Sequence, residues 1–243
     1  MQSLNKQDLI WIVRRMPSQV FDLLKAHKTL FVAGGYIRSV IANEPIADID
    51  LFAPSKDAAR FAAEAIVHIG KVHETENAFS VKLLGGMQVQ FIHRWTFDTP
   101  EACIASFDFT IACAAVWNDD GWKSLADDDF YADLAAKRLV YRKPVRNEDA
   151  GGSMLRVLKF YQRGYRIPLD SLGAVIARLM KGVGADEVAS RVARLGSTVE
   201  HETAFVVTGL LRQVDPLIDP SGLAHLPSSQ EPVEEPQEAK EQQ

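Results

Sequence analysis

The first 70 residues alternate between helical and strand-like patterns. Apolar residues recur at helical spacing across residues 7–28, with a break at Pro17, which predicts two short helices. The apolar run 30–33 stops at Gly34-Gly35, and helical periodicity then resumes, so strand, glycine turn and helix are expected. Residues 46–53 alternate like a strand with one buried face, and the Ala-rich segment 56–69 predicts an amphipathic helix.

A hairpin and an ambiguous segment follow. Residues 78–95 contain two strand-like runs around Gly85-Gly86, which predicts a two-residue type I′ turn, because both of its central positions need positive φ. Residues 106–117 fit either strand or helix by periodicity, and a helix starting near Ser106 or Asp108 is slightly favoured.

The later part of the chain is mainly helical. Residues 138–144 predict a short strand, and residues 148–163 an amphipathic helix that Gly164 ends. Two or three further helices are expected within 171–181 and 186–212.

This order of elements predicts an α+β fold, with a small mixed sheet flanked by helices and then a short helical part. We expect N-terminal helices over residues 1–27, packed on a catalytic unit at 28–146. A helical unit should occupy 147–213, and the Pro, Glu and Gln content of 214–243 predicts a disordered acidic tail.

Composition narrows the function classes. The 243 residues carry a formal net charge of −5, so no global basic field favours sequence-independent binding to a long polyanion. Cys103 and Cys113 lie in apolar settings without a CxxC pair, and are expected as buried thiols in a reducing compartment. No apolar run approaches the roughly 20 residues of a membrane span, and the N-terminus does not resemble a signal peptide. A soluble, cytoplasmic protein is therefore expected.

Asp48 and Asp50 are the first candidate chemistry. Two residues apart on a strand, their side chains leave the same face and repel each other unless a cation lies between them. Mg²⁺ suits a pair of carboxylates completed by phosphate oxygens and water, and two such ions would assist attack and departure in phosphoryl chemistry. A lone pair of this kind more often just flanks a surface strand.

The glycine pair before them changes this balance. Gly34 and Gly35 stand between a strand and a helix, where a backbone without Cβ atoms can approach a phosphate. Arg38, one turn into that helix, can reach the same anion with several donors. A glycine turn alone is weak evidence, but together with the following carboxylates it predicts a phosphate and metal site.

These residues resemble a known family. The segment GGYIR followed by DID resembles the GGxxR and DxD signature of polymerase-β-like nucleotidyltransferases, in particular the head domain of bacterial tRNA CCA-adding enzymes and poly(A) polymerases. Three further segments resemble the motifs of this family in the same order, at 107–116, 131–141 and 148–160. The resemblance implies a Mg²⁺-dependent enzyme that uses an NTP, ATP or CTP, and acts on an RNA 3′ end.

The resemblance also assigns residues. It implies that Asp48 and Asp50 are catalytic and hold Mg²⁺, with a second ion less certain. Nucleotide binding falls to a longer set: Gly34, Gly35, Arg38, Asp108, Arg156 and Lys159. Without the resemblance, the stripe that Arg156, Lys159 and Arg163 form would be interpreted as a solvated helix face.

The sequence departs from the family at several of these points. Ser39 follows the arginine where the family usually has Asp, Phe107 replaces an arginine, and Gln90 stands where a third carboxylate is usual. Ser153 replaces the first arginine of the last motif. The family's template for choosing CTP and ATP is thus altered.

Three functions remain open from the sequence. The first is transfer of NMP to an RNA 3′ end, and the second is transfer to a protein or small molecule, as in toxin or antiphage systems. The third is nucleotide binding without turnover, which Gln90 and Phe107 favour. Trp95, Trp117 and Trp122 could stack on bases, but packing roles are expected for them. The acidic run 127–129 is expected to form a turn and helix cap.

Overall fold

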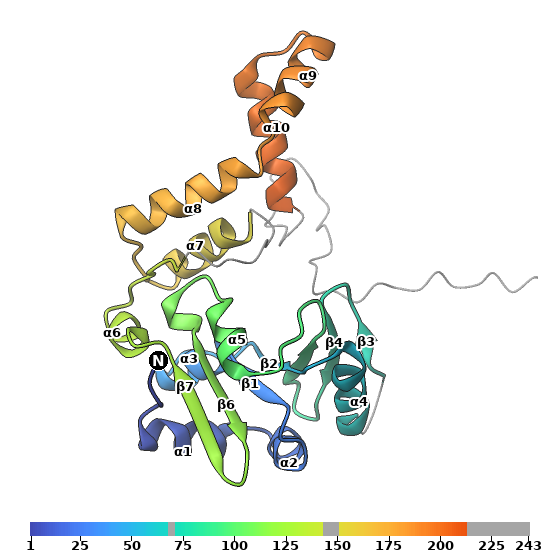
Figure 1. The fold of residues 1–243 in the computed structure, drawn as a ribbon, viewed down its shortest axis with the longest axis vertical. Coiled ribbons are helices and arrows are strands. Elements are labelled where there is room, and N and C mark those ends of the chain that lie inside the picture. The colour runs from blue at the N-terminus through green and yellow to red at the C-terminus, as the bar shows by residue number, and fades with distance from the viewer. Residues whose placement is uncertain (68–70, 143–150, 213–243) are drawn as a thin grey trace, which may run out of the picture.

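A mixed seven-stranded sheet lies at the centre of the computed structural model, which describes residues 1–67, 71–142 and 151–212 (Figure 1). The strand order in the sheet is β3-β4-β5-β2-β1-β6-β7. The strands are β1 (Phe31–Ala33), β2 (Asp48–Phe52), β3 (His73–Glu74), β4 (Ala78–Lys82), β5 (Gln88–Ile92), β6 (Ala114–Asn118) and β7 (Trp122–Ala126).

Helices surround the sheet and extend beyond it. Those before residue 143 are α1 (Lys6–Arg15), α2 (Ser18–Ala26), α3 (Gly35–Ile41), α4 (Lys56–Ile66), α5 (Pro100–Ala105) and α6 (Phe130–Ala135), with a 3₁₀ turn η1 (Thr110–Ala112). After residue 150 come α7 (Gly152–Gln162), α8 (Leu169–Lys181), α9 (Ala185–Leu195) and α10 (Val199–Arg212). Figure 1 shows α7 next to the sheet and α9 and α10 farthest from it. In the described ranges, no helix has the length and apolar character to cross a membrane.

The two faces of the sheet are covered unequally. The main core contains Val32, Ile49 and Leu51 together with residues of α1 to α4, so these helices cover one face. On the other face, Phe31 and Phe52 pack in a second core with α5. Because α5 contacts β1, β6 and β7, part of this face over β2, β5 and β4 remains uncovered.

Strand register aligns side chains across that uncovered face. β2 pairs parallel with β5, and β5 pairs antiparallel with β4. This places Asp50, Gln90 and Ser80 in one row across three strands. The next row on the same face, two residues along each strand, is Phe52, Ile92 and Ala78. A polar row and an apolar row therefore lie side by side.

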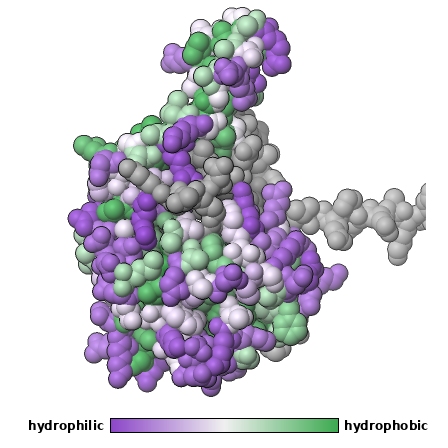
Figure 2. Space-filling model, viewed as in Figure 1, coloured by the Kyte–Doolittle hydropathy of each residue, from purple (hydrophilic) through white to green (hydrophobic). Residues whose placement is uncertain are grey.

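Most of the predicted elements are confirmed. The helix break at Pro17, the strand and helix around the glycine pair, and the helix that ends before Gly164 all occur. Three helices follow, Cys103 and Cys113 are both buried, and Figure 2 shows polar and apolar residues interspersed on the visible face. The predicted tail lies outside the described residues.

The predicted hairpin exists, but its turn differs. β4 and β5 pair antiparallel as expected. The Gly86 amide donates to the Leu83 carbonyl at 3.0 Å, so the central turn residues are Leu84 and Gly85, and not the two glycines. Gly85 and Gly86 do adopt positive φ, of 97° and 89°. The loop is thus longer than a two-residue type I′ turn.

The helix favoured for residues 106–117 is wrong. α5 ends at Ala105, and the Ser106 hydroxyl donates back to the Cys103 carbonyl and does not cap a new helix. After η1 the chain forms β6, which pairs with both β1 and β7. Hydrogen bonding to two strands outweighs the weak local preference, which periodicity alone cannot detect.

The strand expected at 138–144 is also wrong in its described part. Arg138 and Tyr141 form only isolated bridges, with Arg166 and Phe109 respectively. The segment is extended but has no continuous neighbouring strand, and residues 143–150, with Glu148 and Asp149, lie outside the described ranges.

The conformation of the glycine turn yields a first prediction. Gly34 has φ 81° and ψ −124°, which L side chains rarely adopt, so Gly34→Ala should lower the free energy of unfolding by about 1–3 kcal/mol. Gly35 has no positive φ, and a Cβ there would meet the Arg38 guanidinium at an ordinary 3.7 Å. Gly35→Ala should therefore stay within about 0.5 kcal/mol of the parent in urea denaturation. Equal losses in both variants would contradict this assignment.

Candidate active site

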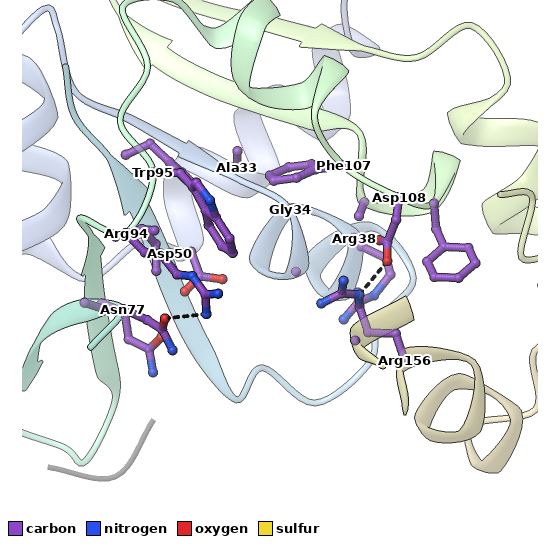
Figure 3. A pocket seen from close by; sticks show the side chains of 18 of the residues that line it. Ala33, Gly34, Arg38, Asp50, Asn77, Arg94, Trp95, Phe107, Asp108 and Arg156 are labelled. Atoms are coloured by element: carbon purple, nitrogen blue, oxygen red, sulfur yellow. Dashed lines mark hydrogen bonds and ion pairs between the residues drawn. The ribbon is translucent and has the colours of Figure 1, made fainter. Parts of the chain in front are cut away.

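A pocket of about 310 Å³ opens over the uncovered part of the sheet (Figure 3). Its floor is the two rows of side chains on β2, β5 and β4, and its rim includes the start of α3 and residues of α7. Six of the eight site residues expected from the sequence line it: Gly34, Gly35, Arg38, Asp50, Asp108 and Arg156. Asp48 and Lys159 are not part of its lining.

The two carboxylates stand on one face of β2. Both Asp48 and Asp50 are half-buried, and the fully buried Ile49 points to the opposite face. Burial raises the pKa of Asp50, and the charge of Asp48 raises it further, while Arg38 opposes the shift. Burial also raises the pKa of Asp48, against the lowering influence of Arg38 and of two cations of α7 and its C-cap, Lys159 and Arg163. The pair is therefore a site of unfavourable negative charge.

This donor set fits Mg²⁺ together with substrate phosphates. Buried carboxylates that destabilise each other are neutralised by a divalent cation, and Mg²⁺ takes one or two carboxylates plus phosphate oxygens and water. In the ranges that the structure describes, no group of three or more His, Cys, Asp or Glu side chains could hold a metal. Gln90 of β5 pairs with Asp50 of β2 and so places a neutral amide next to the two aspartates. The protein alone thus offers an incomplete shell.

Arg38 is a buried cation at the edge of the pocket. Its side chain is 7% exposed, and its guanidinium carbon lies 4.7 Å from the centre of the Phe160 ring. Nη2 donates to the Ser39 hydroxyl at 3.3 Å, but Nε has no hydrogen-bond partner and lies 3.8 Å from a Glu44 carboxylate oxygen. Burial lowers the pKa of Arg38 from its ordinary value. An incompletely bonded, buried guanidinium beside Gly35 is suited to bind an anion.

Asp108 and Arg156 meet on the same side of the pocket as Arg38. Arg156 Nε donates to Asp108 Oδ2 at 2.6 Å, and the Ser153 hydroxyl donates to the same oxygen at 2.9 Å. Ser153, a departure from the family motif, thus helps to orient the carboxylate. Figure 3 shows this ion pair between the two side chains. Arg156 therefore points to the pocket, whereas Lys159 on the same helix acts on Asp48.

Several pocket residues were not expected from the sequence. Trp95, for which packing was expected, lines the pocket with Arg94 and Asn77. Arg94 Nη1 donates to Asn77 Oδ1 at 3.0 Å, and its guanidinium lies 4.7 Å from the centre of the Trp95 ring. The predicted hairpin was the signal that could have found these residues. Pairing of β4 with β5 places Asn77, just before β4, beside Arg94, just after β5. Trp117 and Trp122 do pack as expected, Trp117 against the second core and Trp122 against Phe21.

Comparison with known proteins identifies the family. The sequence profile described as "Gabija anti-defense 2 family protein" matches residues 3–137, more than half of the chain. The chain belongs to this family. The match includes β1 to β7 and the segment from Gly34 to Asp108, and ends before α7. None of the curated proteins matches significantly.

Solved structures show the fold. The CCA-adding enzyme of Thermotoga maritima complexed with tRNA superposes with a TM-score of 0.54 at 17% identity, covering 86% of this chain and 55% of that chain. CCA-adding enzyme complexes with CTP and with ATP both give 0.55, at 20% and 19% identity, covering 87% and 86% of this chain. This chain spans 51% and 54% of those two chains, about half their length. The predicted α+β fold is confirmed, and it is a fold shared with CCA-adding enzymes.

The raised pKa values predict a cost in stability. Because the folded-state pKa of Asp50 lies above its unfolded value, folded protein loses stability as pH rises from about 4 through the folded pKa. Asp50→Asn removes this loss, so without divalent cations it should raise Tm by roughly 2–4 °C at pH 8 and much less at pH 4.5. Differential scanning fluorimetry at both pH values measures this. A Tm gain that is equal at both pH values would contradict the carboxylate repulsion.

Proposed function

We propose that this protein is a Mg²⁺-dependent nucleotidyltransferase that transfers NMP from an NTP to an acceptor hydroxyl and releases pyrophosphate. The observation that carries the proposal is that one pocket is lined by Asp50, by the glycine turn with Arg38, and by Arg156 held on Asp108. Asp48 lies on the same face of β2. The fold shared with CCA-adding enzymes, solved with CTP and with ATP, supports the same reaction class.

Each group has a proposed role. Asp48 and Asp50 would hold Mg²⁺, which when bound neutralises the developing charge of the phosphates. Gly34, Gly35 and Arg38 would hold the β- and γ-phosphates, and Asp108 with Arg156 the sugar or base. In the reaction the acceptor oxygen bonds to the α-phosphorus, the bond from that phosphorus to the bridging oxygen breaks, and the hydroxyl proton goes to solvent. Residues 28–146 would perform the chemistry, and 147–213 would contribute contacts from α7.

Two acceptors have support. An RNA 3′ end is the first candidate, because the structural neighbour from Thermotoga maritima was solved with tRNA. The family description favours a second candidate, a protein or small molecule that belongs to a Gabija defence system.

A different function, binding of a nucleotide without turnover, is the alternative to both acceptors. Gln90 in place of a carboxylate is the feature that favours it.

A labelling experiment tests the proposal. The purified protein is incubated with Mg²⁺, each of the four labelled NTPs, and either total RNA or a lysate of cells with a Gabija system. Asp48→Ala with Asp50→Ala should reduce transfer by more than about a hundredfold, because loss of a group that merely supports a ligand already costs about 10–100-fold. Asp22→Ala, on the exposed side of α2, is the matched control and should label like the parent.

The outcomes separate the candidates. Label on RNA supports the first acceptor, and label on protein or on a small molecule supports the second. Transfer that persists in the double variant would refute the proposed site. NTP binding without label on any acceptor would refute the proposed nucleotidyltransferase activity.

Arg156 gives a further prediction, on nucleotide affinity. Its side chain is fixed by the Asp108 ion pair, and a lysine cannot keep both this bond and a second, forked contact to the nucleotide. Arg156→Lys should raise KM for the NTP by about tenfold with a smaller change in kcat, since a hydrogen bond to a charged group is worth about 1.5–3 kcal/mol. The exposed Arg194→Lys on α9 is the control. An unchanged KM would remove Arg156 from the nucleotide site.

A further inference from the structure

The pocket extends beyond the residues that the donor nucleotide needs. Figure 3 shows Asp108, Arg38 and Arg156 on one side of Gly34, and Trp95, Arg94 and Asn77 on the other, next to Asp50. The first group accounts for the phosphates and the base of the NTP. The second group, with Ser80, Gln90, Ile92 and Ala78, forms an acceptor lobe over β5 and β4.

The reaction geometry determines what must enter this lobe. In phosphoryl transfer the attacking and leaving oxygens lie roughly in line on opposite sides of the phosphorus. With the leaving phosphates at Gly34 and Arg38, on the β1 side of β2, the attacking hydroxyl must come from the other side of Asp50. That side is the one on which β5 and β4 follow β2 in the sheet.

The acceptor lobe contains a fixed aromatic surface. Arg94 lies against Trp95 and donates to the Asn77 side chain at 3.0 Å, while the Arg94 backbone amide donates to the Asn77 carbonyl, also at 3.0 Å. The Thr75 hydroxyl accepts from the amides of Asn77 and Ala78, which fixes the turn that presents Asn77. Trp95 is thus held by a cation and a braced turn beside an apolar row. Such a surface suits a planar ring, because bases commonly stack on aromatic side chains in single-stranded nucleic-acid sites.

A polar row lies beside the aromatic surface. Ser80 is 6% exposed and its hydroxyl has no hydrogen-bond partner, although it lines the pocket. Gln90, 4% exposed, lies between Ser80 and Asp50 in the same row. A buried hydroxyl without a partner is costly unless a ligand group completes it. The row of Ser80 and Gln90 lies about 6.6 Å from the apolar row of Ile92 and Ala78, two residues along each strand.

We propose that the acceptor lobe binds the terminal nucleoside of a single-stranded RNA, with the base stacked on Trp95 and the ribose hydroxyls on Ser80 and Gln90. The terminal hydroxyl then faces Asp50. This inference rests on the proposed function and names the part of the acceptor that the pocket recognises. It favours the RNA acceptor over a protein, because a ring and a vicinal diol together satisfy both rows of the lobe. The 2′-hydroxyl bound by Ser80 would distinguish RNA from DNA.

Binding without turnover tests this inference separately from catalysis. The probe is an eight-nucleotide RNA with a 5′ fluorescein, titrated with the full chain at low ionic strength without NTP and followed by fluorescence anisotropy. Trp95→Ala should weaken RNA binding by about tenfold, within the range expected for one stacked base. Trp95→Phe should keep most of the parent affinity, because its ring can still stack. Trp11→Ala, exposed on α1 and absent from the pocket lining, should bind like the parent.

A second variant examines the polar row. The parent should bind the RNA more tightly than the DNA of the same sequence, and Ser80→Ala should bring the two affinities within about twofold while leaving DNA binding unchanged. Parent protein that binds no RNA, or Trp95→Ala that binds it like the parent, would overturn the acceptor lobe. RNA binding that depends on Trp95 without any NMP transfer would instead refute the proposed reaction alone.

Discussion

Repulsion between the carboxylates of Asp48 and Asp50 is the constraint around which this site is built. The strand period places both on one face, and the core fixes that arrangement, because Ile49 and Leu51 are buried on the opposite face. Neither aspartate can turn away without exposing those apolar side chains. The folded protein therefore retains an unfavourable charge pair, a cost that is explained if a cation and phosphates are to be bound there. Proteins commonly give up stability in this way at functional sites.

The cations that moderate this charge connect two parts of the chain. Arg38 lies on α3, in the sheet-containing part, whereas Lys159 and Arg163 belong to α7 and its C-cap. Phe160 of α7 packs on the Arg38 guanidinium. The Arg156 side chain of the same helix pairs with Asp108.

Other contacts join α7 to the sheet at the same place. The Tyr165 hydroxyl, just past the helix, donates to Glu44 at 2.8 Å, and Glu44 lies beside Arg38. Residues of the site thus help to position this helix, together with the packing of Val157 and Phe160 in the main core. Changes in charge at the pocket, including the arrival of a nucleotide, would therefore act directly on the contacts that hold α7 against the sheet.

The sequence was most informative where local pattern and function coincide. Alternation located β2 and showed that Asp48 and Asp50 share a face, and the glycine pair between apolar run and helix located the turn at which Gly34 adopts positive φ. These features depend only on neighbouring residues. The departures Gln90 and Ser153 were also visible, but their surroundings were not. Ser153 proves to bond to Asp108, a contact between segments 45 residues apart that spacing cannot reveal.

Errors arose where distant pairing decides the structure. Residues 114–118 form a strand because β1 and β7 lie on either side, and local periodicity contains no information about those neighbours. The place of Trp95 in the pocket was not predicted for a related reason, because it depends on the register of β4 against β5 and on the braced turn at Asn77. The turn itself was mispredicted, since the glycines were assigned to its centre and lie one position later.

The most direct test of the central claim is a crystal structure with Mn²⁺ and an NTP analogue that has a methylene bridge between its α- and β-phosphorus atoms. This account predicts an anomalous scattering peak between Asp48 and Asp50, with the triphosphate against Gly34, Gly35 and Arg38 and the base near Arg156. A nucleotide bound in the pocket with its phosphates away from the two aspartates, or Mn²⁺ bound elsewhere in the protein, would contradict it.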